Sequence, residues 1–169
     1  MSGFGDCRPQ SHEPPMSDPL AYFLTWTTYG TWLPGDERGW VERGRGEQLP
    51  NLARKEWAES LMTETPRYFD REQRALVERT ISEHCAIRRW HLFIVICRTN
   101  HVHVVVHANC HPETIRDQFK AWCTRRLNEL QLDRGEKARK NWWTERGSER
   151  YINDEENLED VVLYVRDAQ

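Results

Sequence analysis

The pattern of hydrophobic and polar positions predicts strands at the start and in the middle of the chain. Residues 20–29, LAYFLTWTTY, are aromatic and rich in threonine, which favours a strand. Residues 91–97, HLFIVIC, are almost continuously apolar, residues 98–101 reverse the chain, and residues 102–107 return as another strand. These two runs therefore predict an antiparallel hairpin at the centre of a sheet.

Apolar residues at helical spacing, with recognisable helix starts, predict three helices in the first four fifths of the chain. Residues 51–62 are compatible with a short helix. Asp70, followed three residues later by Gln73, predicts a capped start for the next one. Pro112 stands where a first helical residue would. The apolar stripe of the helix that it begins comprises Ile115, Phe119, Trp122, Cys123, Leu127 and Leu130.

The C-terminal part adds a strand and a last helix. Residues 142–152 predict an extended segment that ends in an edge strand. Asn153, with Glu156 three residues later, predicts the N-cap of the helix that follows. The buried stripe of this helix comprises Leu158, Val161, Val162 and Val165. Strands and helices in this mixed order predict an α+β fold, a ferredoxin-like or RRM-like antiparallel sheet with helices packed on it.

Length and composition suggest one domain. A chain of 169 residues can bury a real core, which we assign to residues 20–169, and the polar, proline-rich residues 1–19 are expected to form a disordered tail. No apolar run reaches about 18 residues, so no membrane span is expected. The N-terminus lacks the order of a signal peptide, which favours a cytoplasmic protein. The five cysteines form no CxxC pair and are expected to be reduced thiols.

Charge is unevenly distributed along the chain. The net charge of −3 does not by itself indicate a nucleic-acid-binding protein. Residues 111–151 contain ten Lys and Arg against seven Asp and Glu, whereas residues 152–169 contain one Arg against six acidic residues. A phosphate-binding surface must therefore be local, with an affinity that falls as salt rises. An ordinary surface of mixed charge would give the same counts.

The candidate chemistry begins with His101-Val102-His103. A strand places residues i and i+2 on the same face, about 7 Å apart, so both imidazoles can hold one divalent metal ion. Two histidines on a half-exposed strand, without any metal, have the same pattern. A structural zinc site is another alternative, although no pair has zinc-finger spacing. Its potential ligands are Cys97, His101, His103, His107, Cys110 and His111.

Tyr164, in the last predicted helix, is the second candidate. At about 100° per residue, its side chain lies roughly 120° from the centre of the buried stripe, on the flank of the helix. A phenol with a pKa near 10 is a poor nucleophile at neutral pH. Attack on a phosphate would need a metal ion, which the histidine pair could hold. The alternative interpretation is a boundary tyrosine with a solvated hydroxyl.

Taken together, these segments resemble the REP-associated tyrosine transposases. These are relatives of the one-tyrosine HUH transposases, named for a His-hydrophobic-His motif. Residues 24–36, LTWTTYGTWLPGD, are similar to the family's N-terminal strand, and residues 100–106, NHVHVVV, to its central strand. Residues 117–123, DQFKAWC, resemble the helix that follows. Residues 154–159, DEENLE, and residues 164–167, YVRD, resemble the tyrosine helix, so the resemblance spans nearly everything after the first nineteen residues.

The resemblance implies an enzyme that cleaves and rejoins single-stranded DNA. His101 and His103 would bind Mg²⁺ or Mn²⁺, and Tyr164 would attack a phosphodiester to leave a 5′-phosphotyrosine and a free 3′-hydroxyl. In related enzymes a Gln or Asn one helical turn after the tyrosine completes the metal site. That position is Ala168 here, and Gln169 is the candidate third ligand. The alternative is a catalytically weak or domesticated relative that binds hairpin DNA without turnover.

The resemblance also implies DNA as the partner, single-stranded or in a hairpin, and an association with the nucleoid. Because some relatives act as dimers, a homodimer is compatible with it, and the sequence does not distinguish one from a monomer. Trp26, Trp32 and Trp40 are candidates to stack on bases. The candidate phosphate contacts are Arg98, Arg116, Lys120, Arg125 and Arg126.

Overall fold

A computed structural model describes residues 18–42 and 44–167. Nearly all of the predicted tail, together with Ala168 and Gln169, lies outside the described residues.

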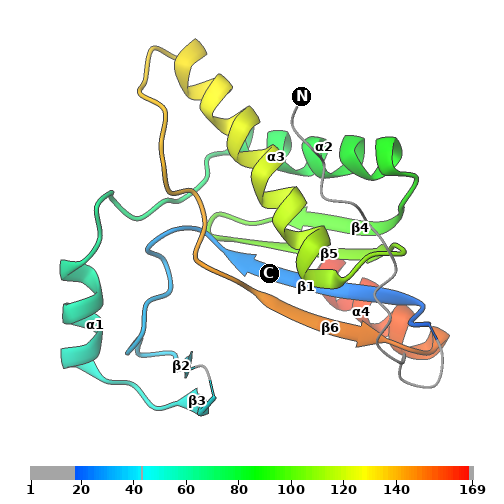
Figure 1. Cartoon of the computed structure of the whole chain (residues 1–169), viewed down its shortest axis with the longest axis horizontal. Coiled ribbons are helices and arrows are strands. Elements are labelled where there is room, and N and C mark those ends of the chain that lie inside the picture. Colours follow the sequence, from blue (N-terminus) through cyan, green and yellow to red (C-terminus); the bar gives the residue numbers. More distant parts are fainter. Residues whose placement is uncertain (1–17, 43, 168–169) are drawn as a thin grey trace.

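A four-stranded antiparallel sheet forms the centre of the molecule (Figure 1). Its strands are β1 (Ala21–Thr27), β4 (His91–Cys97), β5 (His101–His107) and β6 (Ser148–Ile152). They lie in the order β4-β5-β1-β6, and β1 pairs with both β5 and β6. The predicted hairpin of β4 and β5 and the edge position of β6 are confirmed. Only β5 of that hairpin is central, because β4 forms the other edge.

Helices cover both faces of this sheet (Figure 1). Helices α2 (Arg71–Arg88) and α3 (Pro112–Asp133) lie on one face, and α4 (Glu155–Asp167) lies on the other. The order β1-α2-β4-β5-α3-β6 is the βαββαβ arrangement of ferredoxin-like folds, so the predicted α+β class is confirmed. In the described part of the chain, no helix combines the length and the apolar character needed to cross a membrane.

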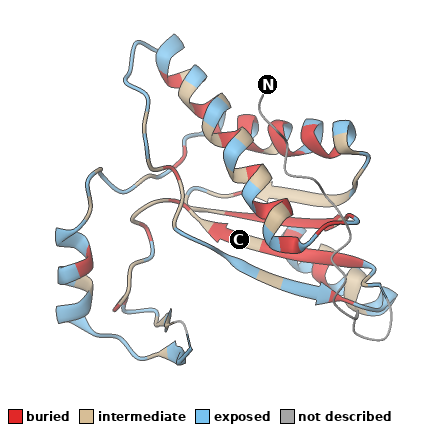
Figure 2. Cartoon of the chain, in the orientation of Figure 1, coloured by how far each residue is buried: buried red, intermediate tan, exposed pale blue. Residues whose placement is uncertain are grey.

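The central strands β1 and β5 are largely buried (Figure 2), and alternation of their side chains divides the core into two layers. Val102 and Val104 of β5 belong to the larger layer beneath α2 and α3, whereas Val105 belongs to the smaller layer beneath α4. Trp26 points into the larger layer and is 1% exposed. The prediction that Trp26 stacks on bases is therefore wrong, because its ring fills the core.

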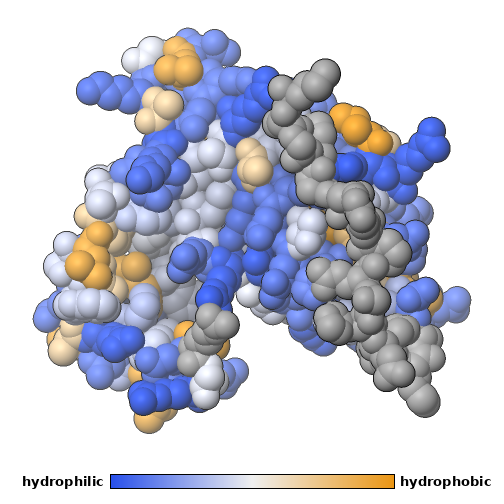
Figure 3. All heavy atoms as spheres, viewed as in Figure 1, coloured by the Kyte–Doolittle hydropathy of each residue, from blue (hydrophilic) through white to orange (hydrophobic). Residues whose placement is uncertain are grey.

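The segment between β1 and α2 extends to one side of the sheet as an arm, described for residues 28–42 and 44–69 (Figure 1). It contains β2 (Trp40–Glu42), β3 (Gly46–Gln48) and α1 (Leu52–Ser60), of which only the helix was predicted. On the face shown in Figure 3, hydrophobic side chains gather beside α1, while the surface over α2 and α3 is mainly hydrophilic.

The ends of the helices follow local signals with one exception. The capping box of Asp70 and Gln73 is present, and Pro112 begins α3, both as predicted. In α4 the backbone N–H of Asn157 donates to the Asp154 side chain at 2.8 Å. Asp154 therefore caps α4, and the prediction of Asn153 is off by one residue.

The cysteines differ in state. Cys85, Cys97 and Cys123 are free and buried. Cys110 is disulfide-bonded, which contradicts the prediction that all five are reduced thiols.

Candidate functional site

The two histidines of the HVH motif lie side by side on the α4 face of β5. Their ring centroids are 4.7 Å apart with planes inclined at 71°. His103 is 8% exposed, and His101 is half-buried. Side chains of β5 alternate between the two faces as expected from the sequence. Val102, between the histidines, and Val104, after His103, point into the opposite core layer.

Each histidine is held through its Nδ1 atom. His103 Nδ1 lies 2.9 Å from the hydroxyl of Thr25, its cross-strand neighbour on β1. His101 Nδ1 lies 2.8 Å from Oδ1 of Asn100, so a proton on this nitrogen would be donated to the amide oxygen. With Nδ1 occupied in both rings, Nε2 is the atom that each can offer to a metal ion.

The surroundings keep these imidazoles in the form that binds metals. Burial, followed by the neighbouring charges of His101 and Arg98, lowers the pKa of His103 to about 4. Burial, together with Arg98, also lowers the pKa of His101. Both rings are therefore neutral at pH 7, and the neutral imidazole is the ligand.

Tyr164 reaches this pair from α4. Val161 and Val165 are buried against the sheet and anchor the helix, which leaves Tyr164 on its flank, as predicted, with 59% of its surface exposed. The Tyr164 ring centroid lies 6.3 Å from that of His103 and 6.4 Å from that of Phe23. The fold thus brings a phenol from the C-terminal helix to a histidine sixty-one positions earlier in the sequence.

The sheet face beneath α4 has a polar half and an apolar half, which follow from the strand register. One end contains residues that pack under the helix: Ala21, Phe23, Val105 and Ile152. The other end aligns polar residues of three strands: Thr25, Thr27, His101, His103, Ser148 and, at the boundary, Arg150 opposite Phe23. The histidine pair and Tyr164 lie where these halves meet, so the candidate site is accessible to solvent and has an apolar wall.

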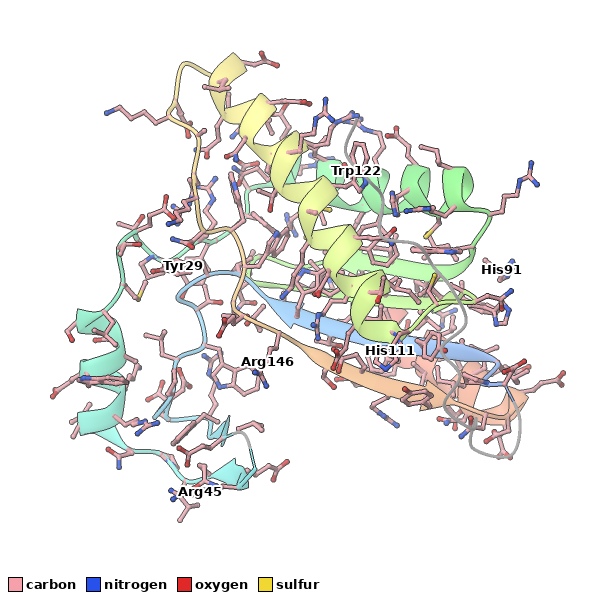
Figure 4. All side chains as sticks on the ribbon, viewed as in Figure 1. Tyr29, Arg45, His91, His111, Trp122 and Arg146 are labelled. Carbon is pink, nitrogen blue, oxygen red and sulfur yellow. The ribbon has the colours of Figure 1, made fainter. Side chains whose placement is uncertain are left out.

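The structure separates the predicted DNA-contacting residues. Arg98 lies close enough to the histidines to lower the pKa of both imidazoles. The other four belong to α3, which covers the opposite face of the sheet (Figure 4, where Trp122 and His111 mark this helix). The four α3 residues are Arg116, Lys120, Arg125 and Arg126.

Two of these α3 side chains are occupied inside the fold. Arg116 is 6% exposed and forms ion pairs with Asp117 and Glu149. Lys120 Nζ donates to the carbonyl oxygens of Thr144 at 2.8 Å and Arg146 at 2.5 Å. Burial, followed by the charge of Arg116, lowers the Lys120 pKa to about 8. Both residues thus have a structural role here that the sequence pattern did not indicate.

The remaining predicted residues lie in different surroundings or outside the described part of the chain. Arg125 and Arg126 are more exposed and lie near Glu129, so a role in DNA contact stays a prediction for them. Gln169, the predicted third metal ligand, lies outside the described residues. Within residues 18–42 and 44–167, no three His, Cys, Asp or Glu side chains converge as a metal site, so the zinc alternative has no support there. Cys97, one of its predicted ligands, points into the core beneath α2 and α3.

Sequence reasoning missed Thr25, Asn100 and Arg150. Thr25 of β1 lies directly opposite His103, and Arg150 of β6 lies opposite Phe23 of β1, so the positions of both residues near the site depend on strand register. No local pattern predicts that register. Asn100, in contrast, directly precedes His101, and its side chain could have been considered as a hydrogen-bond partner from sequence alone.

Comparison with known proteins adds a weak likeness. No protein-family model matches the chain, and no curated protein matches it. Among solved structures, the chain is similar to a REP-associated tyrosine transposase bound to a REP hairpin. The two are 11% identical with a TM-score of 0.48, over 92% of this chain and 69% of the other. A likeness this weak does not assign a function.

Proposed function

We propose that this protein is a metal-dependent endonuclease and strand transferase of the transposase type, acting on single-stranded or hairpin DNA. The observation that carries the proposal is the approach of Tyr164 to the His101–His103 pair, with ring centroids of Tyr164 and His103 6.3 Å apart. This arrangement places a nucleophile beside two neutral imidazoles that could hold a metal ion. The resemblance of several sequence segments to the REP-associated tyrosine transposases supports the same assignment.

The residues present fit a divalent cation, Mg²⁺ or Mn²⁺, in part. His101 and His103 would hold it through Nε2, with Gln169 as the candidate third ligand. Imidazole is an unusual ligand for Mg²⁺, and oxygen atoms of phosphate and water would fill the remaining positions. When bound, the cation would neutralise charge on the phosphate and favour nucleophilic attack on it.

The reaction proposed for Tyr164 exchanges one phosphate ester for another. The phenolic oxygen forms a bond to phosphorus while the bond from phosphorus to the 3′ oxygen breaks. The phenolic proton passes to solvent, and the leaving 3′ oxygen takes up a proton. The products are a 5′-phosphotyrosine and a free 3′-hydroxyl, and attack by a 3′-hydroxyl on the phosphotyrosine reverses the step without a nucleotide triphosphate.

Covalent trapping tests this proposal. The protein is incubated with Mn²⁺ and 3′-labelled single-stranded hairpins from the flanks of its own gene, and the products are resolved on a denaturing gel. We expect a protein–DNA adduct that is absent in Tyr164→Phe and in His103→Ala. Tyr151→Phe is the matched control, because Tyr151 is 44% exposed on β6 but packs against Tyr22 on the other face of the sheet.

The same assay distinguishes the alternative function. The alternative, a relative that binds DNA without turnover, rests on Ala168, which stands where related enzymes have the third metal ligand. This alternative predicts a shifted complex on a native gel and no adduct on the denaturing gel with any flank sequence. An adduct that persists in Tyr164→Phe would contradict both functions as stated.

A further inference from the structure

We infer that Arg150 binds the phosphate group that Tyr164 attacks, as a catalytic residue of the same site. This inference rests on the proposed function. It adds a residue that lies outside the segments resembling the REP-associated tyrosine transposases.

The register of β6 places Arg150 on the face of the histidines. Arg150 lies directly opposite Phe23 of β1, which in turn lies opposite Val105 of β5. Cross-strand partners share a face of the sheet, so Arg150 projects on the α4 side. The preceding residue, Glu149, projects to the other side and pairs with Arg116 of α3. The adjacent charged side chains of Glu149 and Arg150 therefore project from opposite faces of the sheet.

Three functional groups surround the ring of Phe23. The guanidinium carbon of Arg150 lies 5.9 Å from the Phe23 centroid, the His103 ring lies 5.5 Å from it, and the Tyr164 ring 6.4 Å. Phe23 is itself 6% exposed, so it is a fixed apolar platform. A cation over an aromatic face is held in position while its N–H groups stay available for an anion.

Within the part of the chain that the structure describes, the guanidinium of Arg150 forms no ion pair with an acidic side chain. Its side chain is exposed, and none of the ion pairs among the described residues includes it. Arg166, the cation of α4 itself, pairs with Asp167. The helix also carries acidic residues, namely Glu155, Glu156, Glu159 and Asp160, which would repel a DNA backbone. The cation of Arg150 would offset this repulsion on the β6 side of the site.

The chemistry of guanidinium suits that task. Its planar fork can donate two parallel hydrogen bonds to the non-bridging oxygens of a phosphate. Charge on these oxygens changes as the phenolic oxygen approaches phosphorus, and a preorganised donor stabilises that distribution. Arg150 would thus orient the phosphodiester towards Tyr164 from the side opposite β5.

The test measures the rate of adduct formation with Mn²⁺ at saturating DNA. Arg150→Gln is expected to lower this rate by about 10²-fold, the usual cost of removing one such donor. Arg150→Lys keeps the charge but lacks the planar guanidinium. Its rate of adduct formation is expected to lie between those of Arg150→Gln and the unaltered protein. The matched control is Arg79→Gln, because Arg79 is exposed on α2 over the opposite face of the sheet. It removes the same charge and should leave the rate unchanged.

A substrate change separates phosphate binding from a structural role. Replacing one non-bridging oxygen of the scissile phosphate by methyl gives a neutral methylphosphonate, on which an arginine has little charge to bind. The deficit of Arg150→Gln relative to the unaltered protein should shrink to a few-fold on this substrate. An equal deficit on both substrates, or no deficit on the normal one, would overturn the role of Arg150 alone. Absence of any adduct with the unaltered protein would overturn the proposed function and this inference with it.

Discussion

For single residues, the chemistry of His101 and His103 depends on what holds their Nδ1 atoms. A ring that is free to rotate presents either nitrogen, whereas a ring tethered through Nδ1 presents Nε2 in one direction. Thr25 supplies this tether for His103 at 2.9 Å, and the surrounding burial keeps the ring neutral by lowering its pKa to about 4. The metal affinity proposed for the pair should therefore depend on a threonine in another strand.

Replacing the Thr25 tether should weaken metal binding. Thr25→Val keeps the shape of the side chain and removes the hydroxyl, and we expect Mn²⁺ affinity to fall about 10-fold to 100-fold. Titration of the protein with Mn²⁺ by calorimetry measures this. Thr27→Val is the matched control, because the Thr27 hydroxyl lies on the same strand but bonds to Thr144 at 2.7 Å rather than to a histidine. Equal affinities of the two variants would show that the tether does not matter.

Individual site residues were predictable where their signal is local. The HVH motif and the flank position of Tyr164 follow from strand and helix periodicity, and the structure has both as expected. Arg116 shows the limit of such reasoning. The family resemblance suggested that Arg116 contacts DNA, yet its side chain is buried against Glu149, a partner thirty-three residues away in the sequence. Periodicity does not reveal which charges find partners when distant strands come together.

Among the elements, α4 has the greatest bearing on the site because it carries Tyr164. It has 13 residues and would be marginal in isolation, so its stability depends on its cap and on the packing of its apolar stripe. Val161 and Val165 supply that packing, as predicted. The cap was predicted one residue too early, because Asn153 and Asp154 are both good capping residues and only the backbone conformation decides between them.

The two candidate caps of α4 can be compared directly. Asp154→Ala removes the acceptor for the Asn157 N–H and is expected to lower the free energy of unfolding by about 1 kcal/mol. Asn153→Ala should change it by no more than about 0.5 kcal/mol, the usual range for a surface substitution. Urea-induced unfolding of both variants measures this. A larger loss for Asn153→Ala than for Asp154→Ala would contradict the assignment of the cap.

For the molecule as a whole, the order of the strands and helices was predictable, but the face of the sheet that each helix covers was not. The alternation of strands and helices indicated a ferredoxin-like sheet, and the order β4-β5-β1-β6 confirms it. Nothing local indicated that α4 would return to the face opposite α2 and α3, or that the arm would contain a hairpin. The position of α4 nonetheless decides that the histidines meet Tyr164 rather than the basic side chains of α3.

The packing of α2 on α3 is expected to make the free energy of unfolding depend on pH. His84 of α2 is 4% exposed, lies among Trp90, Phe119 and Trp122, and bonds to Gln118 at 2.9 Å. Burial is the main cause that lowers the His84 pKa in the folded state, and the charge of Arg88 adds to it, while the bond to Gln118 acts in the opposite direction. In the unfolded chain this pKa returns to about 6.5.

The sign of the effect follows from proton binding. Below about pH 6.5 the unfolded chain takes up a proton on His84 that the folded chain does not, so the free energy of unfolding falls as the pH falls. The slope for one group is at most about 1.4 kcal/mol per pH unit, and it levels off once the pH passes below the lowered folded-state pKa.

Urea-induced unfolding between pH 8 and pH 4 measures the dependence. His84→Gln should be less stable at pH 8, because it loses the ring contacts, but should lose less stability on acidification. Parallel pH profiles for the two proteins would show that His84 does not couple protonation to the packing of these helices.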